Sequence, residues 1–123
     1  MKQYKVCLTI AGSDPSGGAG IQADIKTMTL LGCYAQAVPT CLTVQNTLGV
    51  QRSIPIDAEL VFDQAAVTME DCMPQCVKIG IVPNLAIAHA IYHLTDSVNI
   101  HKLLHCGSLQ RIHSLKSTCK QAG

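Results

Sequence analysis

A glycine-rich turn near the amino terminus is the strongest candidate for chemistry in this sequence. It lies within residues 11–27, AGSDPSGGAGIQADIKT, where an apolar segment leads into residues 14–18 and then into a helical pattern. Proline fixes φ and glycine permits positive φ, so this segment predicts a tight turn. A turn that opens onto a helix amino terminus presents free backbone N–H groups, which suit an anion or a polar substituent of a ring. Alternatively, the glycines only let a strand and a helix pack closely.

Two polar side chains stand near this turn or at the end of a predicted strand. Asp24 falls in the first turns of the predicted helix, where its carboxylate either complements the helix dipole or accepts a hydrogen bond from a substrate hydroxyl. Gln45 follows an apolar run, and its carboxamide can pair with both a donor and an acceptor of a heteroaromatic ring. It could equally close a loop with a hydrogen bond. Residue type alone leaves both alternatives open.

The sequence does not satisfy three familiar ligand-binding motifs. Residues 18–23 satisfy the dinucleotide pattern, but no acidic residue lies between Asp24 and Asp57 to bind ribose hydroxyls. No Gly-Lys-Ser/Thr follows the turn, which excludes a P-loop. Cys72 and Cys76, and the His and Cys residues after position 100, lack the spacing of a structural zinc site. We therefore predict neither metal-binding nor cofactor-binding residues in this chain.

Strand and helix patterns alternate around these residues. The apolar runs predict strands over residues 5–11, 35–44 and 76–82, and a short edge strand over 50–56. Helical spacing predicts helices from Ala19 to a stop at Gly32, from an N-cap at Asp57 through Met69, and from Leu85 to about Leu94. This order is typical of βαβ units, which build an α/β fold around a parallel sheet covered on both faces.

The carboxyl ends of such strands are where ligands bind in open α/β sheets. The glycine-rich turn, Gln45-Asn46 and Gly80-Ile81 all follow predicted strands. We therefore expect these three segments to lie at one edge of the sheet.

The composition is that of one globular domain. The 123 residues are 48% hydrophobic and carry a formal net charge of +1, which argues against nucleic acid as a partner. Every acidic residue lies at or before Asp96, whereas the last stretch is purely basic. We therefore divide the chain into a body, residues 1–95, and a divergent basic tail, residues 96–123, with no strand expected over 99–123. A frameshift in the gene, or disorder, would each account for the tail.

The sequence carries no secretory signal and no run of the ~20 apolar residues that span a bilayer. Its seven cysteines lack the spacing of a small secreted protein. We expect reduced thiols, a cytoplasmic location and no membrane partner.

Three motifs together resemble the opening of the hydroxymethylpyrimidine/phosphomethylpyrimidine kinases. They are LTIAGSDPSGGAGIQADIKT from Leu8, LTVQNTLGVQ from Leu42 and VKIGIV from Val77, and the resemblance covers about residues 5–94. It implies a ribokinase-like three-layer α/β/α fold with a mostly parallel sheet. It also implies phosphorylation of 4-amino-5-hydroxymethyl-2-methylpyrimidine, and then of its monophosphate, with ATP and Mg²⁺ in thiamine biosynthesis.

The resemblance also assigns substrate-binding residues. Gly12 and Asp24 would contact the pyrimidine and its hydroxymethyl group, and Gln45 would pair with the amino and nitrogen edge of the ring. Thr43 takes a position that is often a small apolar residue lining the ring. Ile81 stands where Met is common, a conservative change in an apolar wall.

The resemblance stops after Leu94. Family members continue with a strand ending in Asp-Pro, and later carry a Gly-Thr-Gly-Cys type turn that forms an anion hole and the region of the catalytic base, beside the ATP contacts. Neither element occurs in this sequence. We therefore expect a truncated kinase without catalytic residues of its own and with little or no activity. The alternatives are a fragment of a pyridoxal kinase, which shares the fold, and a non-catalytic fragment that forms a homodimer through its exposed sheet.

Overall fold

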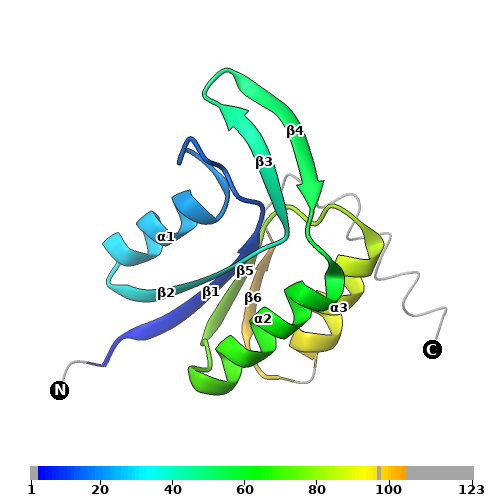
Figure 1. The fold of residues 1–123 in the computed structure, drawn as a ribbon. Coiled ribbons are helices and arrows are strands. Elements are labelled where there is room, and N and C mark those ends of the chain that lie inside the picture. Colours follow the sequence, from blue (N-terminus) through cyan, green and yellow to red (C-terminus); the bar gives the residue numbers. More distant parts are fainter. Residues whose placement is uncertain (1–2, 97, 105–123) are drawn as a thin grey trace.

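The computed structural model describes residues 3–96 and 98–104, which form a parallel sheet flanked by helices, with a separate hairpin (Figure 1). Within these residues, four strands pair in the order β2-β1-β5-β6, and every pairing is parallel. These strands are β1 (Lys5–Ala11), β2 (Cys33–Pro39), β5 (Cys76–Ile79) and β6 (His101–Leu104). The hairpin consists of β3 (Cys41–Asn46) and β4 (Gly49–Pro55), and the helices are α1 (Gly20–Leu30), α2 (Ala58–Asp71) and α3 (Leu85–Asp96).

The two faces of the sheet are covered differently. Leu8 and Ile10 of β1 point into a core shared with α2 and α3, whereas the intervening Thr9 hydrogen-bonds to α1 on the opposite face. Alternate residues of a strand point to opposite faces, so β1 contributes to both layers. The three-layer arrangement of α1, sheet and α2/α3 is visible in Figure 1. The predicted α/β class with a mostly parallel sheet is confirmed.

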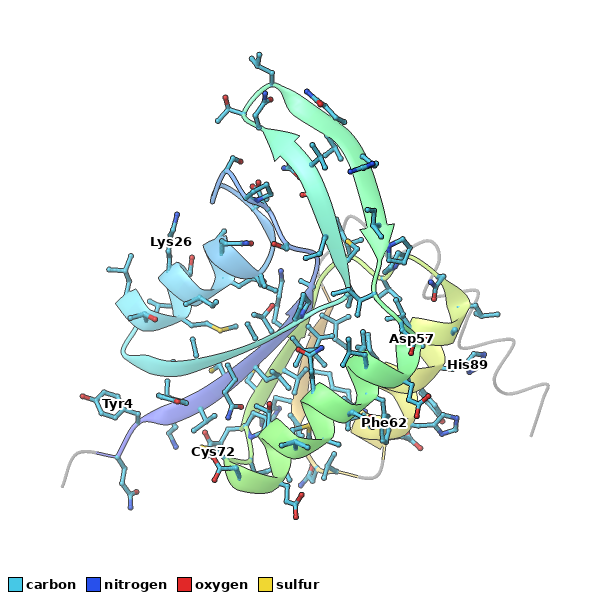
Figure 2. All side chains as sticks on the ribbon, viewed as in Figure 1. Tyr4, Lys26, Asp57, Phe62, Cys72 and His89 are labelled. Atoms are coloured by element: carbon cyan, nitrogen blue, oxygen red, sulfur yellow. The ribbon has the colours of Figure 1, made fainter. Side chains whose placement is uncertain are left out.

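The apolar core lies between the sheet and the α2/α3 layer, where side chains fill the space (Figure 2). Each fully buried Leu, Ile or Val contributes about 1.5–3 kcal/mol through removal of its surface from water. The α1 layer contributes no fully buried residue. The core is made of Leu8, Ile10, Val38, Val61, Ala65, Met69, Val77, Ile79, Ile87 and Ile91.

The helix start predicted at Asp57 is confirmed. Its carboxylate accepts hydrogen bonds from the backbone N–H groups of Glu59 at 3.0 Å and Leu60 at 3.4 Å, which are otherwise unpaired in the first turn. The third predicted helix also forms and extends to Asp96.

The single strand predicted over residues 35–44 is wrong. The segment divides at Thr40, whose N–H donates to Ala11 at 2.8 Å and whose carbonyl accepts from Ile56 at 2.9 Å. The chain before this point pairs with β1, and the chain after it turns away into the hairpin. The predicted strand at 50–56 does form as β4, but its partner is β3 rather than an edge of the main sheet.

The expectation of no strand after residue 99 is also wrong. Four residues form β6, which pairs with β5 in parallel register from Cys76↔His101 to Ile79↔Leu104. Such a short run has no detectable periodicity of its own, and the free edge of β5 supplies its hydrogen-bond partners. Residues 105–123, most of the predicted tail, lie outside the described residues. Within the described ranges, no helix has the length and apolar character needed to cross a bilayer.

Candidate functional site

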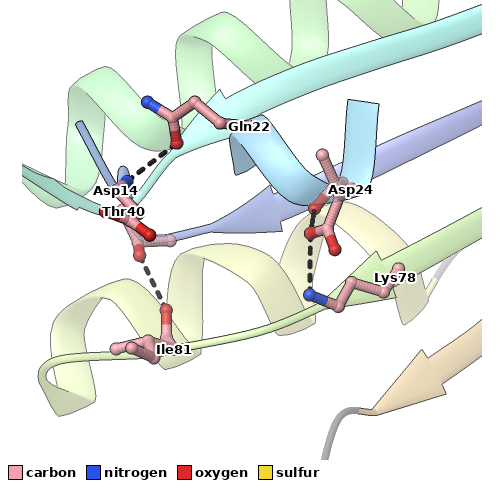
Figure 3. A network of polar contacts seen from close by, with 7 residues as sticks. Asp14, Gln22, Asp24, Thr40, Lys78 and Ile81 are labelled. Atoms are coloured by element: carbon pink, nitrogen blue, oxygen red, sulfur yellow. Dashed lines mark hydrogen bonds and ion pairs between the residues drawn. The ribbon is translucent and has the colours of Figure 1, made fainter. Parts of the chain in front are cut away.

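The carboxyl ends of β1 and β5 and the base of the hairpin are tied together by hydrogen bonds. Ser13 N–H donates to the carbonyl of Cys41 at 2.9 Å, and the Thr40 hydroxyl donates to the carbonyl of Ile81 at 2.7 Å (Figure 3). Thr40 is completely buried, so this second bond is shielded from water. The glycine-rich turn and Gly80-Ile81 therefore meet at this edge as expected. Gln45-Asn46 do not end a strand of the main sheet: they lie at the outer end of β3 in the separate hairpin, because the chain leaves the main sheet at Thr40.

Four of the five predicted substrate-binding residues lie in this junction. A Cβ placed on Gly12 would lie 2.9 Å from Cys41 Sγ and 3.9 Å from Ile81 Cβ, so a larger residue there would collide with β3. Thr43 Oγ1 donates to the carbonyl of Ser13 at 2.7 Å and lies 3.2 Å from Gln45 Oε1. The side chain of Ile81 is half exposed, at 55%. The junction thus combines a close backbone approach, a carboxamide and an apolar side chain.

The glycine-rich turn is organised around the carboxylate of Asp14. Its Oδ1 accepts from the N–H of Ser16 at 2.9 Å and from the Ser16 hydroxyl at 2.6 Å, and its Oδ2 accepts from the N–H of Ala19 at 2.8 Å. These bonds, above all that from the Ser16 hydroxyl, hold the pKa of Asp14 below its usual value. Asp14 is only 3% exposed. The turn therefore carries its own anion, which already pairs with the N–H groups of Ser16 and Ala19. Binding of a ligand's anion or polar ring substituent at this turn stays a prediction.

Gln22 of α1 holds the same turn in place with two hydrogen bonds, and the sequence did not predict this role. Its Oε1 accepts from the N–H of Asp14 at 2.7 Å (Figure 3). Its Nε2 donates to Ser13 Oγ at 2.8 Å. A glutamine in the first turn of a helix carries no local signal for such a role. Gly20 is also required here, because its φ is +60° and a Cβ on it would collide with the carbonyl oxygen of Gly12.

Asp24 lies beneath this edge, between α1 and the sheet. Its Oδ2 accepts from the Thr9 hydroxyl at 2.6 Å and from Lys78 Nζ at 2.7 Å (Figure 3). The Lys78 and Asp24 side chains are 14% and 18% exposed. The carboxylate is thus held in a largely buried ion pair in addition to any substrate contact. A sequence signal did exist, since Thr9 and Lys78 are polar residues inside two short apolar strands.

The described residues do not fit a metal site. Within residues 3–96 and 98–104, no group of three or more His, Cys, Asp or Glu side chains could hold a metal ion. His89 and His93 lie one turn apart on α3 and stack with their ring centroids 6.5 Å apart. Cys72 and Cys76 are free thiols, and the remaining metal candidates, His105, Cys106, His113 and Cys119, lie outside the described residues.

The parallel sheet, with a glycine-rich turn and a hairpin at its carboxyl edge, defines a ribokinase-like α/β protein, and known structures share this arrangement. The phosphomethylpyrimidine kinase of Clostridium difficile 630 superposes with a TM-score of 0.77 and 40% identity, over 81% of this chain and 44% of that one. The pyridoxal kinase of Staphylococcus aureus, solved with AMP-PCP, superposes with a TM-score of 0.74 and 26% identity, over 84% of this chain and 38% of that one.

Sequence comparison identifies the family of this chain within the ribokinase-like fold. Residues 14–105 match the family described as phosphomethylpyrimidine kinase. The hydroxymethylpyrimidine/phosphomethylpyrimidine kinase of Mycobacterium leprae is 46% identical over 84 residues, which are 68% of this chain and 30% of that protein. The Bacillus subtilis enzyme of the same name is 39% identical over 104 residues, 85% of this chain and 38% of that protein. The chain belongs to the phosphomethylpyrimidine kinase family and spans roughly a third of the length of these relatives.

Proposed function

We propose that this chain forms the pyrimidine-binding wall of a kinase that phosphorylates hydroxymethylpyrimidine, and then its monophosphate, in thiamine biosynthesis. The observation that carries the proposal is that the hairpin, through Thr43 and the neighbouring Gln45, meets the carboxyl edge of the main sheet beside Gly12 and Ile81, in a chain of this family. Parallel α/β sheets bind their ligands at that edge.

Each residue has a role that its chemistry allows. The Gln45 carboxamide pairs with the amino group and the adjacent nitrogen of the ring. Gly12 lets the ring approach the backbone, and the half-exposed Ile81 covers one ring face. Asp24 accepts a hydrogen bond from the substrate's hydroxymethyl group through its Oδ1, because its Oδ2 already accepts from Thr9 and Lys78. These assignments rest on the positions that match the family motifs.

We further propose that the phosphoryl donor is ATP with Mg²⁺, and that the protein acts in the cytoplasm. AMP-PCP bound to the S. aureus pyridoxal kinase supports a nucleotide donor for this fold. The described residues supply neither a metal site nor an open anion site at the glycine-rich turn, where Asp14 is already bound. Phosphoryl transfer depends on positioning and on stabilisation of charge. We therefore expect the 123-residue chain alone to turn over no substrate in a coupled ATP-consumption assay.

Substitution of Gln45 tests the pyrimidine site. In this chain, completed with the carboxyl-terminal part of a family member, Gln45→Ala should weaken pyrimidine binding roughly tenfold, because a polar group left unpaired in a buried site costs about 1–3 kcal/mol. Isothermal titration calorimetry would measure the affinity for the pyrimidine and for ATP. Gln51→Ala, on the exposed strand β4, is the matched control. Equal losses for both ligands, or a large fall in the melting temperature, would make Gln45 a structural residue instead.

Pyridoxal is the alternative substrate, favoured by the structural likeness to pyridoxal kinases. Those structures share 26% and 28% identity with this chain, against 40% for the phosphomethylpyrimidine kinase. Competition between the two ligands in the completed protein separates the possibilities. Tighter binding of pyridoxal would overturn the pyrimidine assignment and retain the kinase fold.

A further inference from the structure

The hydroxyl of Thr43 faces two hydrogen-bond acceptors at the junction. Its Oγ1 is 2.7 Å from the carbonyl oxygen of Ser13 and 3.2 Å from Gln45 Oε1. Thr43 and Gln45 lie two residues apart on β3, so their side chains share one face of the hairpin. Both are half-buried, in contrast to the exposed residues on either side of each. Thr43 is therefore the point at which the end of β1, the hairpin and the carboxamide meet.

A threonine hydroxyl has one hydrogen to donate and two lone pairs that can accept. The shorter contact, to Ser13, takes the hydrogen. A carboxamide oxygen facing the same hydroxyl would then place two acceptors together without a hydrogen between them. Amide oxygen and nitrogen are assigned from the hydrogen-bond network, and rotation of the Gln45 carboxamide by half a turn makes Nε2 the donor to Thr43 Oγ1. Both contacts then become hydrogen bonds.

This arrangement decides which edge of Gln45 is available. One N–H is used by Thr43, so Oε1 and the second N–H remain as the pairing edge. That edge matches a ring with an amino donor next to a nitrogen acceptor. Among the described residues, the Gln45 carboxamide has no other hydrogen bond that fixes its orientation.

We propose that Thr43 is a positioning residue: it anchors the Ser13 carbonyl to the hairpin and orients the Gln45 carboxamide toward an aminopyrimidine edge. The ligand part of this inference rests on the function proposed above, whereas the anchoring part does not. An apolar residue of the same shape, as in Thr43→Val, keeps the packing and removes both hydrogen bonds. Thr43→Ser keeps the hydroxyl and removes the methyl group.

Ser13 has other attachments that keep the junction folded when Thr43 is changed. Its N–H donates to Cys41, and its hydroxyl accepts from Gln22. The valine variant should therefore fold, and a loss of order at Gln45 can be separated from a collapse of the site.

The first experiment uses the 123-residue chain without ligand. Nuclear magnetic resonance relaxation of the Gln45 side-chain amide should show a clearly lower order parameter in Thr43→Val than in the wild type, with shifted amide signals for Ser13 and Asp14. Thr43→Ser should match the wild type. If Gln45 is equally ordered in the valine variant, or equally disordered in all three chains, Thr43 does not position it.

The second experiment titrates the same three variants, each completed with the carboxyl-terminal part of a family member, with hydroxymethylpyrimidine and with pyridoxal. We expect Thr43→Val to weaken pyrimidine binding about fivefold or more, and pyridoxal binding less than about twofold, with Thr43→Ser close to the wild type. Equal losses of affinity for the two ligands would mean that Thr43 does not favour the pyrimidine over pyridoxal. If the wild type binds neither ligand, the proposed function fails for this chain, and the relaxation measurement still decides the anchoring role.

Discussion

Asp14 illustrates how one side chain can settle the chemistry of a loop. A glycine-rich turn before a helix offers N–H groups to any anion, but here those of Ser16 and Ala19 are already bound by a carboxylate of the same turn. The turn is consequently a rigid frame for the end of β1. A second negative charge, such as a phosphate, would meet repulsion from Asp14 rather than free donors.

The depressed pKa of Asp14 predicts a pH dependence. Because the pKa is lower in the folded than in the unfolded protein, where it is about 3.9, the carboxylate stabilises the fold above this value, and the contribution is lost as the pH falls through the folded-state pKa. Asp14→Asn should therefore lower the melting temperature at pH 7, and the difference from wild type should narrow at lower pH. Thermal scans between pH 7 and pH 3 would measure this. Asp63→Asn, at an exposed position of α2, is the matched control.

Cys7 is the second residue whose titration is informative. Burial, together with the neighbouring thiols of Cys33 and Cys76, raises its pKa to about 11. Since the thiolate is the reactive form, iodoacetamide should alkylate Cys7 more slowly than Cys72 at pH 7.5, and the Cys7 rate should keep rising up to about pH 11. Mass spectrometry of digested samples gives both rates in one experiment. Faster labelling of Cys7 at neutral pH would contradict the assigned environment.

At the scale of elements, the pair Asp24–Lys78 connects α1 to β5. It also links two residues 54 positions apart in the sequence, on the sheet face that lacks a large apolar core. This ion pair therefore helps to hold α1 against its face of the sheet, whereas apolar packing holds α2 and α3 against the other face. It also fixes the helix that carries Gln22, and hence the glycine-rich turn.

Removal of the lysine should loosen α1. Lys78→Met leaves the Asp24 carboxylate with only the Thr9 hydroxyl, and we expect a loss of about 1–3 kcal/mol in the free energy of unfolding. Urea denaturation measures the loss, and the double variant Asp24→Asn/Lys78→Met should lose less than the sum of the single variants. Lys26→Met is the control, because Lys26 projects from α1 into solvent (Figure 2) and its hydrogen bond to the carbonyl of Gly17 is exposed. Additive losses would mean that the two side chains do not interact.

At the scale of the whole molecule, the hairpin projects from the body and exposes apolar side chains. Leu42 and Ile54 are opposite each other in the β3–β4 register and are 55% and 50% exposed, and Val44 beside them is 43% exposed. A two-stranded hairpin is only marginally stable in water by itself. The homodimer considered from the sequence used the exposed main sheet. We propose this apolar face of the hairpin as an alternative surface for a second copy of the chain.

Size-exclusion chromatography with light scattering tests the dimer. The wild-type chain should shift from monomer toward dimer as its concentration rises. Leu42→Thr/Ile54→Thr should remain monomeric with a similar melting temperature, because both residues lie outside the core. A wild-type chain that stays monomeric at every concentration counts against the hairpin interface.

The sequence by itself determined the features that depend on neighbouring residues. The alternation of strands and helices, the cap at Asp57 and the tight turn at residues 14–18 follow from hydrophobic periodicity and turn chemistry, which are local. The ends of the predicted strands also placed the glycine-rich turn and Gly80-Ile81 at one edge of the sheet. The family motifs assigned substrate roles to Gly12, Thr43, Gln45 and Ile81, and these roles stay predictions.

Tertiary structure alone decided the rest. The break at Thr40, the ion pair of Asp24 with Lys78 and the strand β6 all depend on partners far away in the sequence. An apolar run such as residues 35–44 has the same local preference for extended backbone whether it forms one strand of a single sheet or divides between two sheets. The hydrogen bonds that end β2 come from Ala11, Ile56 and Ile81, and these groups meet only when the sheet has formed. Local patterns specify which element forms, whereas the pairing of distant donors and acceptors specifies where it ends and what it binds.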